Sequence, residues 1–195
     1  MNYQNFKIRA SAGGKLMTEP RAKSETLSET TKSYLKEWAI CQMFNVQNEI
    51  KSKYTERGIQ DEDKAIDLMM TVLDLPFTIK NEQYFENDYF CGTPDLIIGD
   101  TVYDAKCVWS CFTFPIFEKE LQNKDYFYQL QIYMHLTGCK KAVLSYVLLD
   151  NEAIPHIYEV EPKQRVKTFE FDYNPEVIEK LKNKEIECRN FLKQL

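Results

Sequence analysis

Apolar and polar positions along the chain follow two patterns, one typical of helices and the other typical of strands. Helical spacing of apolar residues predicts helices in four segments, which are residues 33–46, 59–73, 125–136 and 175–195. Short apolar runs predict three strands, of which one ends near residue 85 and the others cover 142–149 and 156–160. Because helices and strands alternate, we expect an α/β fold with a mixed central sheet.

Polar residues mark where the expected helices begin and end. Thr30 or Thr31 is expected to cap the first helix, and Gly138 to follow the third. Asn174 can cap the last helix and Pro175 can open it. The polar residues before the first helix are expected to form a loop or a short helix.

Residues 96–106 predict a β-hairpin that carries charged side chains. A glycine followed by an aspartate suits a two-residue turn between its strands. Because side chains alternate between the two faces of a strand, Asp104 and Lys106 should share one face. The hairpin can also bring Asp95, at the start of its first strand, close to Asp104. Two carboxylates and an ammonium group then converge, although a surface ion pair on an edge strand is the structural alternative.

Two further groups of polar side chains lie on helices that are otherwise apolar. Glu62 falls on the apolar stripe of the second expected helix, whereas Asp61 and Asp63 should point away from it. Gln129 and Tyr133 lie one turn apart on the third helix, so their polar ends should face the same way. Each group has a structural alternative to ligand binding, namely a salt bridge for Glu62 and an internal hydrogen bond for the other two.

Length and composition limit the organisation of the chain. Its 195 residues are 44% hydrophobic and include 12 Tyr and 12 Phe, enough for one folded domain with a sizeable core. Within this single domain, residues 1–195, we expect an N-terminal helical part over 1–75 and a sheet core over 76–160. The C-terminal helix over 175–195 completes it.

Charge and cysteine spacing narrow the classes of partner. The net charge of −5 gives no general attraction to nucleic acid, so DNA contacts would need local basic residues or metal ions held by carboxylates. No apolar run approaches the roughly 18 residues that cross a bilayer, and no secretion signal is recognisable, so we expect a cytoplasmic protein without membrane contact. The six cysteines lack CxxC spacing and the two histidines stand apart, so neither zinc nor an iron–sulfur cluster is expected.

Taken in order, these motifs resemble those of a nuclease superfamily. The series is Gly58-x-x-x-Glu62, Pro94-Asp95, Asp104-Ala105-Lys106 and Gln129-x-x-x-Tyr133. It resembles the PD-(D/E)XK superfamily, and most of all its λ-exonuclease and YqaJ-type phage recombination branch. The stretches RASAGGKLMTEPR and DYFYQLQIYMHLTG are similar to the same branch, so the resemblance spans residues 9–149. It implies a restriction-endonuclease-like core, with a mixed central β-sheet flanked by helices.

The resemblance implies a metal-dependent active site. Asp95, Asp104 and the backbone carbonyl of Ala105 would hold Mg²⁺, or Mn²⁺ in its place, since hard cations prefer oxygen ligands. Glu62 would support a second ion or its waters. Lys106 would orient or deprotonate the attacking water and stabilise charge in the transition state.

The same resemblance implies residues that contact the substrate. Gln129 would position the water or the phosphate. The expected DNA- and phosphate-binding residues are Ser11, Arg9, Arg21, Thr93 and Tyr133. The sequence departs from the branch at two positions, since Asp104 stands where a glutamate is usual and Gln4 where an arginine binds a terminal phosphate. A preference for a 5′-phosphorylated end would therefore depend on another cation, for which Arg9 or Lys7 could substitute.

The activity implied by the resemblance is degradation of double-stranded DNA from its ends, in the 5′-to-3′ direction, which leaves a 3′ overhang. The branch also implies a homo-oligomer such as a trimer, a partner single-strand annealing protein, and a phage or prophage origin in the cytoplasm of a bacterial host. The alternatives are a PD-(D/E)XK endonuclease or nickase, and a catalytically silent DNA-binding module with the same fold.

Overall fold

The computed structural model describes residues 3–46, 53–151 and 154–195, of which 53–60 are described by their backbone. The helices are α1 (Gly13–Leu16), α2 (Glu29–Phe44), α3 (Lys53–Val72), α4 (Lys124–Thr137) and α5 (Pro175–Leu192). The strands are β1 (Ile8–Arg9), β2 (Phe85–Glu86), β3 (Phe90–Gly92), β4 (Leu96–Ile98), β5 (Thr101–Val108), β6 (Lys141–Leu148) and β7 (Val166–Asp172). Short 3₁₀ helices lie at Tyr3–Asn5, Ala10–Ala12, Ile157–Glu159 and Pro162–Gln164.

The larger sheet is mixed and has the strand order β4-β5-β6-β7. β5 and β6 run parallel and are joined through α4, whereas the other neighbouring strands are antiparallel. Asp104 and Lys106 of β5 lie opposite Leu144 and Tyr146 of β6. Both charged residues therefore sit on an interior strand of the sheet rather than at its edge.

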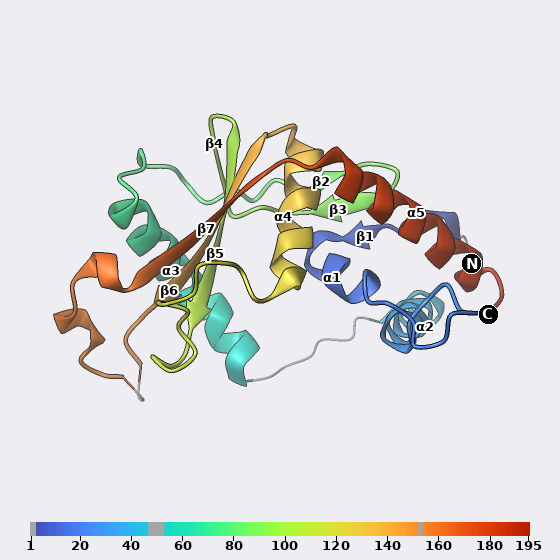
Figure 1. Ribbon diagram of the computed structural model, residues 1–195, viewed down its shortest axis with the longest axis horizontal. Helices are drawn as coiled ribbons and strands as arrows, with labels where there is room; N and C mark the ends of the chain where they lie inside the picture. Colours follow the sequence, from blue (N-terminus) through green and yellow to red (C-terminus); the bar gives the residue numbers. More distant parts are fainter. Residues whose placement is uncertain (1–2, 47–52, 152–153) are drawn as a thin grey trace.

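Helices cover both faces of the larger sheet. α4 lies across one face and also contacts the smaller sheet, whose strand order is β1-β3-β2 (Figure 1). α3 covers the opposite face, where Ile66 and Met69 pack in one cluster with Ala105 and Val147. The predicted α/β fold, with a mixed sheet flanked by helices, is confirmed.

One arginine near the end of the chain joins three distant segments. Arg189 of α5 donates hydrogen bonds to the carbonyl oxygens of Phe6 and Asp88, and it also forms an ion pair with the fully buried Glu185. Phe6 lies two residues before β1, and Asp88 lies in the turn between β2 and β3. The last helix therefore fixes the smaller sheet at both of these points.

Helix ends follow local chemistry, with one correction to the expected cap. Asn174 caps α5 as predicted, and Gly138 ends α4 with a φ of 81°. The first long helix begins earlier than expected, because Ser28 rather than Thr30 or Thr31 is its cap. The Ser28 hydroxyl accepts the backbone N–H of Thr31 at 3.0 Å, which satisfies one of the free donors of the first turn.

Two expectations about strands are wrong. The segment 156–160 contains a 3₁₀ helix, and the strand expected to end near residue 85 begins there instead, as β2. β7 was not predicted. It lies at the edge of the sheet, where several of its side chains reach solvent. The expected hairpin is confirmed, with Leu96 opposite Tyr103 and Gly99 in the left-handed region at a φ of 60°.

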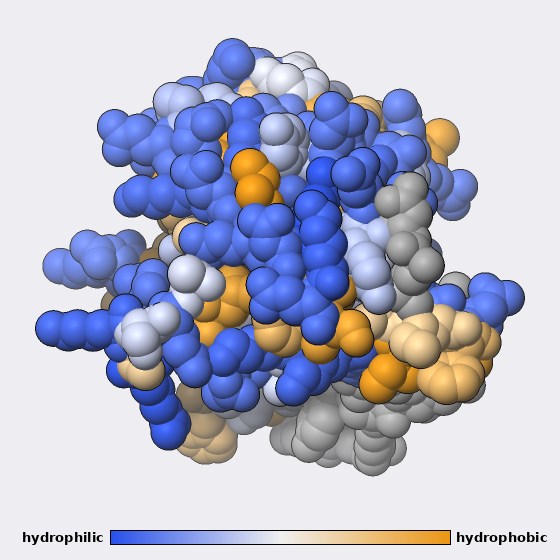
Figure 2. Space-filling view, turned by 90° about the vertical axis from the view of Figure 1, so that its right-hand side faces the viewer, coloured by the Kyte–Doolittle hydropathy of each residue, from blue (hydrophilic) through white to orange (hydrophobic). Residues whose placement is uncertain are grey.

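The surface at the α2 and α5 end of the molecule is mostly hydrophilic, with a band of apolar side chains (Figure 2). α2 buries Thr31, Leu35 and Ala39 but leaves Met43 and Phe44 more than half exposed. Among the described residues, no helix is both long and apolar enough to span a bilayer.

Candidate active site

The β4–β5 hairpin brings two aspartates together as expected. Asp95 directly precedes β4, and its Oδ2 accepts the backbone N–H of Ala105 at 2.8 Å. Ala105 is the residue after Asp104 on β5, so this one hydrogen bond fixes the first carboxylate beside the second. Asp95 is 8% exposed and Asp104 is 1% exposed, which makes this a buried pair of acids rather than a surface cluster.

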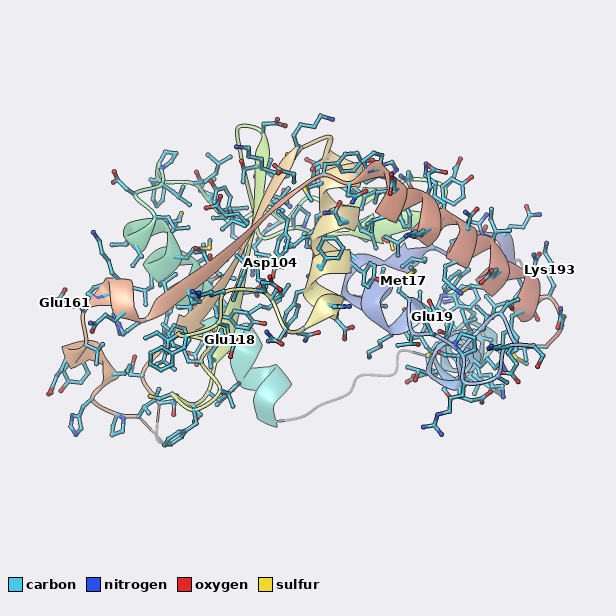
Figure 3. The ribbon with its side chains drawn as sticks, viewed as in Figure 1. Met17, Glu19, Asp104, Glu118, Glu161 and Lys193 are labelled. Carbon is cyan, nitrogen blue, oxygen red and sulfur yellow. The ribbon has the colours of Figure 1, made fainter. Side chains whose placement is uncertain are left out.

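Asp104 is held from two sides. Its Oδ1 accepts a hydrogen bond from Gln129 Nε2 at 3.0 Å, and its Oδ2 lies 2.6 Å from Lys106 Nζ. Among the described residues, the Lys106 ammonium is the partner of Oδ2. The shared face predicted for Asp104 and Lys106 is therefore confirmed, and it looks toward α4 (Figure 3).

Both amide hydrogens of Gln129 are donated to neighbouring side chains and position them. Nε2 donates one hydrogen to Asp104 and the other to the hydroxyl of Tyr133, again at 3.0 Å. Gly92 of β3 leaves room for the Tyr133 ring, because a Cβ at this glycine would lie 2.8 Å from Tyr133 Cε1. The predicted alignment of Gln129 and Tyr133 on α4 is confirmed, and it fixes the orientation of Asp104.

Burial and mutual repulsion raise the pKa of both acids. Removal from water, together with the charge of Asp104, raises the pKa of Asp95 to about 7. Burial also raises the pKa of Asp104 above its usual range, although the neighbouring lysine opposes this shift. For Lys106, burial would lower the pKa, but the attraction of Asp104 and Asp95 outweighs it and raises the pKa. Lys106 is thus an ammonium ion at neutral pH.

Glu62 lies at the margin of this cluster and forms an ion pair with another lysine, Lys80. Its Oε2 is 2.7 Å from Nζ of Lys80, which also lies 3.8 Å from Asp63. The Asp61 side chain is 16% exposed, less than the 29% of Glu62, so the expectation that Asp61 points away is wrong. Lys80 was missed by the sequence analysis. It lies in the stretch where the sequence predicts only a strand that ends near residue 85, and only the fold shows that it returns to α3.

The expected phosphate-binding residues fall into separate places. Gly92 lies beside Ala10, because a Cβ on Gly92 would approach both Ala10 and Tyr133. Ser11 follows Ala10 and Thr93 follows Gly92, so these two residues lie on neighbouring backbone segments. Arg9 instead lines a groove of about 830 Å³ with Lys7, Trp38 and Tyr84. Arg21 lines another hollow, together with Glu25 and Glu29. The structure thus does not bring the two arginines into one cluster.

The donor set suits a hard cation without forming a complete cage. Among the described residues, no three His, Cys, Asp or Glu side chains are grouped closely enough to hold a metal ion by themselves. Mg²⁺ commonly binds through one or two carboxylates and takes its other ligands from water and substrate. Asp104 Oδ2, buried against the Lys106 ammonium, and Asp95, with its raised pKa, are oxygen donors that would gain from such an ion.

Comparisons with known proteins show a shared fold. The sequence matches no family profile, and no curated protein matches it. The structure is similar to that of a phage-related exonuclease from Haemophilus somnus 129PT, with a TM-score of 0.86 and 27% identity over 97% of this chain and 94% of that one. It is also similar to the alkaline exonuclease LHK-Exo from Laribacter hongkongensis, with a TM-score of 0.75 and 14% identity over 96% and 88% of the two chains. LHK-Exo has also been solved in complex with dAMP.

Proposed function

We propose that the chain is a nuclease of the λ-exonuclease and YqaJ-type branch of the PD-(D/E)XK superfamily, because its ordered motifs resemble that branch and its fold is similar to that of a phage-related exonuclease. It is a metal-dependent deoxyribonuclease that hydrolyses double-stranded DNA from an end, in the 5′-to-3′ direction. The observation that carries this proposal is the convergence of Asp95, Asp104 and Lys106 in one buried cluster.

Four groups would hold the metal in this proposal: Asp95, Asp104, the backbone carbonyl of Ala105, and Glu62. When bound, Mg²⁺, or Mn²⁺ in its place, would neutralise phosphate charge and lower the pKa of a bound water. Glu62 would have to give up its ion pair with Lys80 to bind an ion through Oε2, since this oxygen lies 2.7 Å from the Lys80 ammonium. Lys80 would then be free to contact a DNA phosphate.

The chain's own residues have separate tasks at the phosphate. Gln129 keeps Asp104 in one orientation through its hydrogen bond. The Lys106 side chain donates hydrogen bonds to the phosphate or the attacking water and stabilises negative charge, since Asp104 and Asp95 raise its pKa. The hydroxyls of Ser11 and Thr93 donate to a phosphate of the bound strand.

Contacts of this kind position DNA without reading its sequence, so we infer little base specificity. Arg9 and Arg21 would contact the backbone away from the scissile phosphate, from the two hollows that they line. The wider assembly that the motifs imply belongs to the same proposal. It comprises one nuclease domain over residues 1–195, a homo-oligomer such as a trimer, an annealing protein as partner and the cytoplasm of a phage host.

The test is digestion of linear duplexes labelled at the 5′ or 3′ end, beside a closed circular duplex, with Mg²⁺ and with EDTA. We expect Mg²⁺-dependent loss of the linear DNA, release of the 5′ label first, and an intact circle. Cutting of the circle would identify an endonuclease or nickase instead. No cleavage with either Mg²⁺ or Mn²⁺ would identify a DNA-binding module without activity.

A further inference from the structure

Two aromatic side chains stand in solvent on the segment that joins β5 to α4. In this β5–α4 segment, residues 109–123, Phe112 is 100% exposed and Phe117 is 92% exposed. A phenylalanine gains about 1.5–3 kcal/mol by leaving water, so full exposure of two of them on one short segment needs an explanation. The segment connects the strand of Asp104 and Lys106 to the helix of Gln129 (Figure 3).

The segment is anchored and presents these rings from a defined backbone. Phe114, between the two exposed rings, is 7% exposed and packs in one cluster with Val108, Leu148 and Ile157. Ser110 closes the turn before it, since its Oγ accepts the N–H of Phe112 at 3.2 Å. The exposed rings are therefore held at fixed points beside a buried neighbour.

This anchor places the segment next to the active site. Val108 lies two residues beyond Lys106 on the same strand, so the two side chains share one face and their Cα atoms are roughly 7 Å apart. At its other end the segment leads into α4, where the ring of Tyr126 lies 5.4 Å from Lys106 Nζ. The segment therefore begins close to Lys106 along β5, and its other end leads to Tyr126, whose ring contacts the Lys106 ammonium.

Two exposed lysines near the rings can reach an anionic chain, although the segment itself also carries Glu118 and Glu120. Lys119 in the segment and Lys124 at the start of α4 are exposed, and neither has an ion pair or hydrogen bond among the described residues. They border a hollow of about 570 Å³ that Phe127, Phe169 and Phe171 line, with Glu120 and Glu170 at its margin. Exposed rings beside free lysines are the combination that binds single strands, because every base has a face that stacks.

We propose that the β5–α4 segment binds unpaired bases of DNA beside the active site. Phe112 and Phe117 stack on the bases, and Lys119 and Lys124 contact the strand's phosphates. This rests on the proposed nuclease function, because an enzyme that removes nucleotides from a duplex end must handle bases that have lost their partners.

The test measures binding of a labelled oligo(dT) strand by fluorescence anisotropy in EDTA, where binding is separate from cleavage. We expect the double variant F112A/F117A to bind about thirtyfold more weakly or worse, in line with the loss of stacking on two bases. The matched control is Phe44→Ala, which removes a ring that is 69% exposed on α2. It should bind like the wild type.

A second measurement addresses the lysines. Lys119→Gln and Lys124→Gln should each reduce the slope of log affinity against log salt by about 0.7, whereas Lys180→Gln on α5 should not change it. Unchanged oligo(dT) affinity of F112A/F117A would overturn the proposal. So would a changed oligomeric mass of this variant by light scattering, which would identify the rings as a protein interface. Because binding is read in EDTA, a failure of the nuclease proposal itself would appear only in the digestion of linear duplexes.

Discussion

At the scale of single residues, the site combines groups whose charges conflict unless a cation is present. Asp95 and Asp104 are both buried, and the pKa of each is raised. Lys106 compensates only part of this cost, because its ammonium lies against one oxygen of Asp104. Two buried carboxylates with one shared ammonium suit a site that gains free energy when a divalent ion and a phosphate enter.

Replacement of Lys106 by methionine keeps most of the side-chain volume and removes the ammonium. We expect Lys106→Met to lower the cleavage rate of linear duplex DNA by about 10²–10³, the usual loss when a charge-stabilising donor is removed. Circular dichroism should show the wild-type fold, and DNA binding in EDTA should persist. The matched control is Lys64→Met, which removes a lysine paired with Asp61 on α3. Wild-type cleavage by Lys106→Met would exclude this lysine from the site.

Sequence reasoning predicted those residues whose relation depends on local geometry. Asp104 and Lys106 share a face because strands have a period of two, and Gln129 faces Tyr133 because helices have a period near four. The same reasoning missed Lys80 and misplaced Asp61. The position of Lys80 depends on how the chain returns after α3, and the exposure of Asp61 depends on which residues pack against it. Neither property can be predicted from the local pattern of apolar and polar residues.

At the scale of elements, a pair of glycines lets α1 approach α4. A Cβ on Gly14 would overlap the backbone of Asp125, whereas a Cβ on Gly13 would lie 3.0 Å from the end of the Ile132 side chain. The helix that carries Gln129 is therefore seated directly on the N-terminal segment that carries Ser11. This contact couples Ser11, whose hydroxyl we propose to bind phosphate, to the helix that orients Asp104.

The two glycines should respond differently to the same substitution. Gly14→Ala should lower the free energy of unfolding by about 3 kcal/mol, because backbone must move, and Gly13→Ala by about 1 kcal/mol, because a methyl group can turn aside. Urea unfolding followed by circular dichroism measures both. Equal costs for the two variants would contradict the close backbone contact at Gly14.

The elements also differ in how far the sequence predicted them. α4, α5 and the β4–β5 hairpin follow their patterns closely, since their apolar positions face one core and their ends carry caps or turn residues. β1 and β3 were not predicted, and β7 was not either. β1 and β3 are two and three residues long and pair in parallel across some 80 positions, which no local pattern records.

At the scale of the whole molecule, the junction of Glu185 and Arg189 makes stability depend on pH. Burial raises the pKa of Glu185 from 4.5 to about 7, although Arg189 opposes the shift. A carboxyl group that holds its proton more tightly in the folded state stabilises that state below the unfolded pKa. This contribution is lost as the pH rises through the folded pKa. The loss therefore falls between about pH 4.5 and pH 7.

Glu185→Gln removes this dependence because the amide does not titrate. The free energy of unfolding of the variant, minus that of the wild type, should increase by about 2–3 kcal/mol between pH 5 and pH 8. Urea titrations in EDTA at both pH values measure the difference. Glu187→Gln is the control, since Glu187 lies near the surface in an ion pair with Lys184. A difference that does not change with pH would show that Glu185 is already ionised at pH 5.

The reach of Arg189 across the fold has a consequence for the order of events during synthesis. The carbonyl oxygen that it binds belongs to Phe6, a residue made 183 positions earlier. Until α5 has left the ribosome, β1 and the turn before β3 lack the hydrogen bonds of this guanidinium, so the smaller sheet lacks part of its support. The nuclease site, which leans on that sheet through Gly92 and Tyr133, would thus mature only as α5 emerges from the ribosomal tunnel.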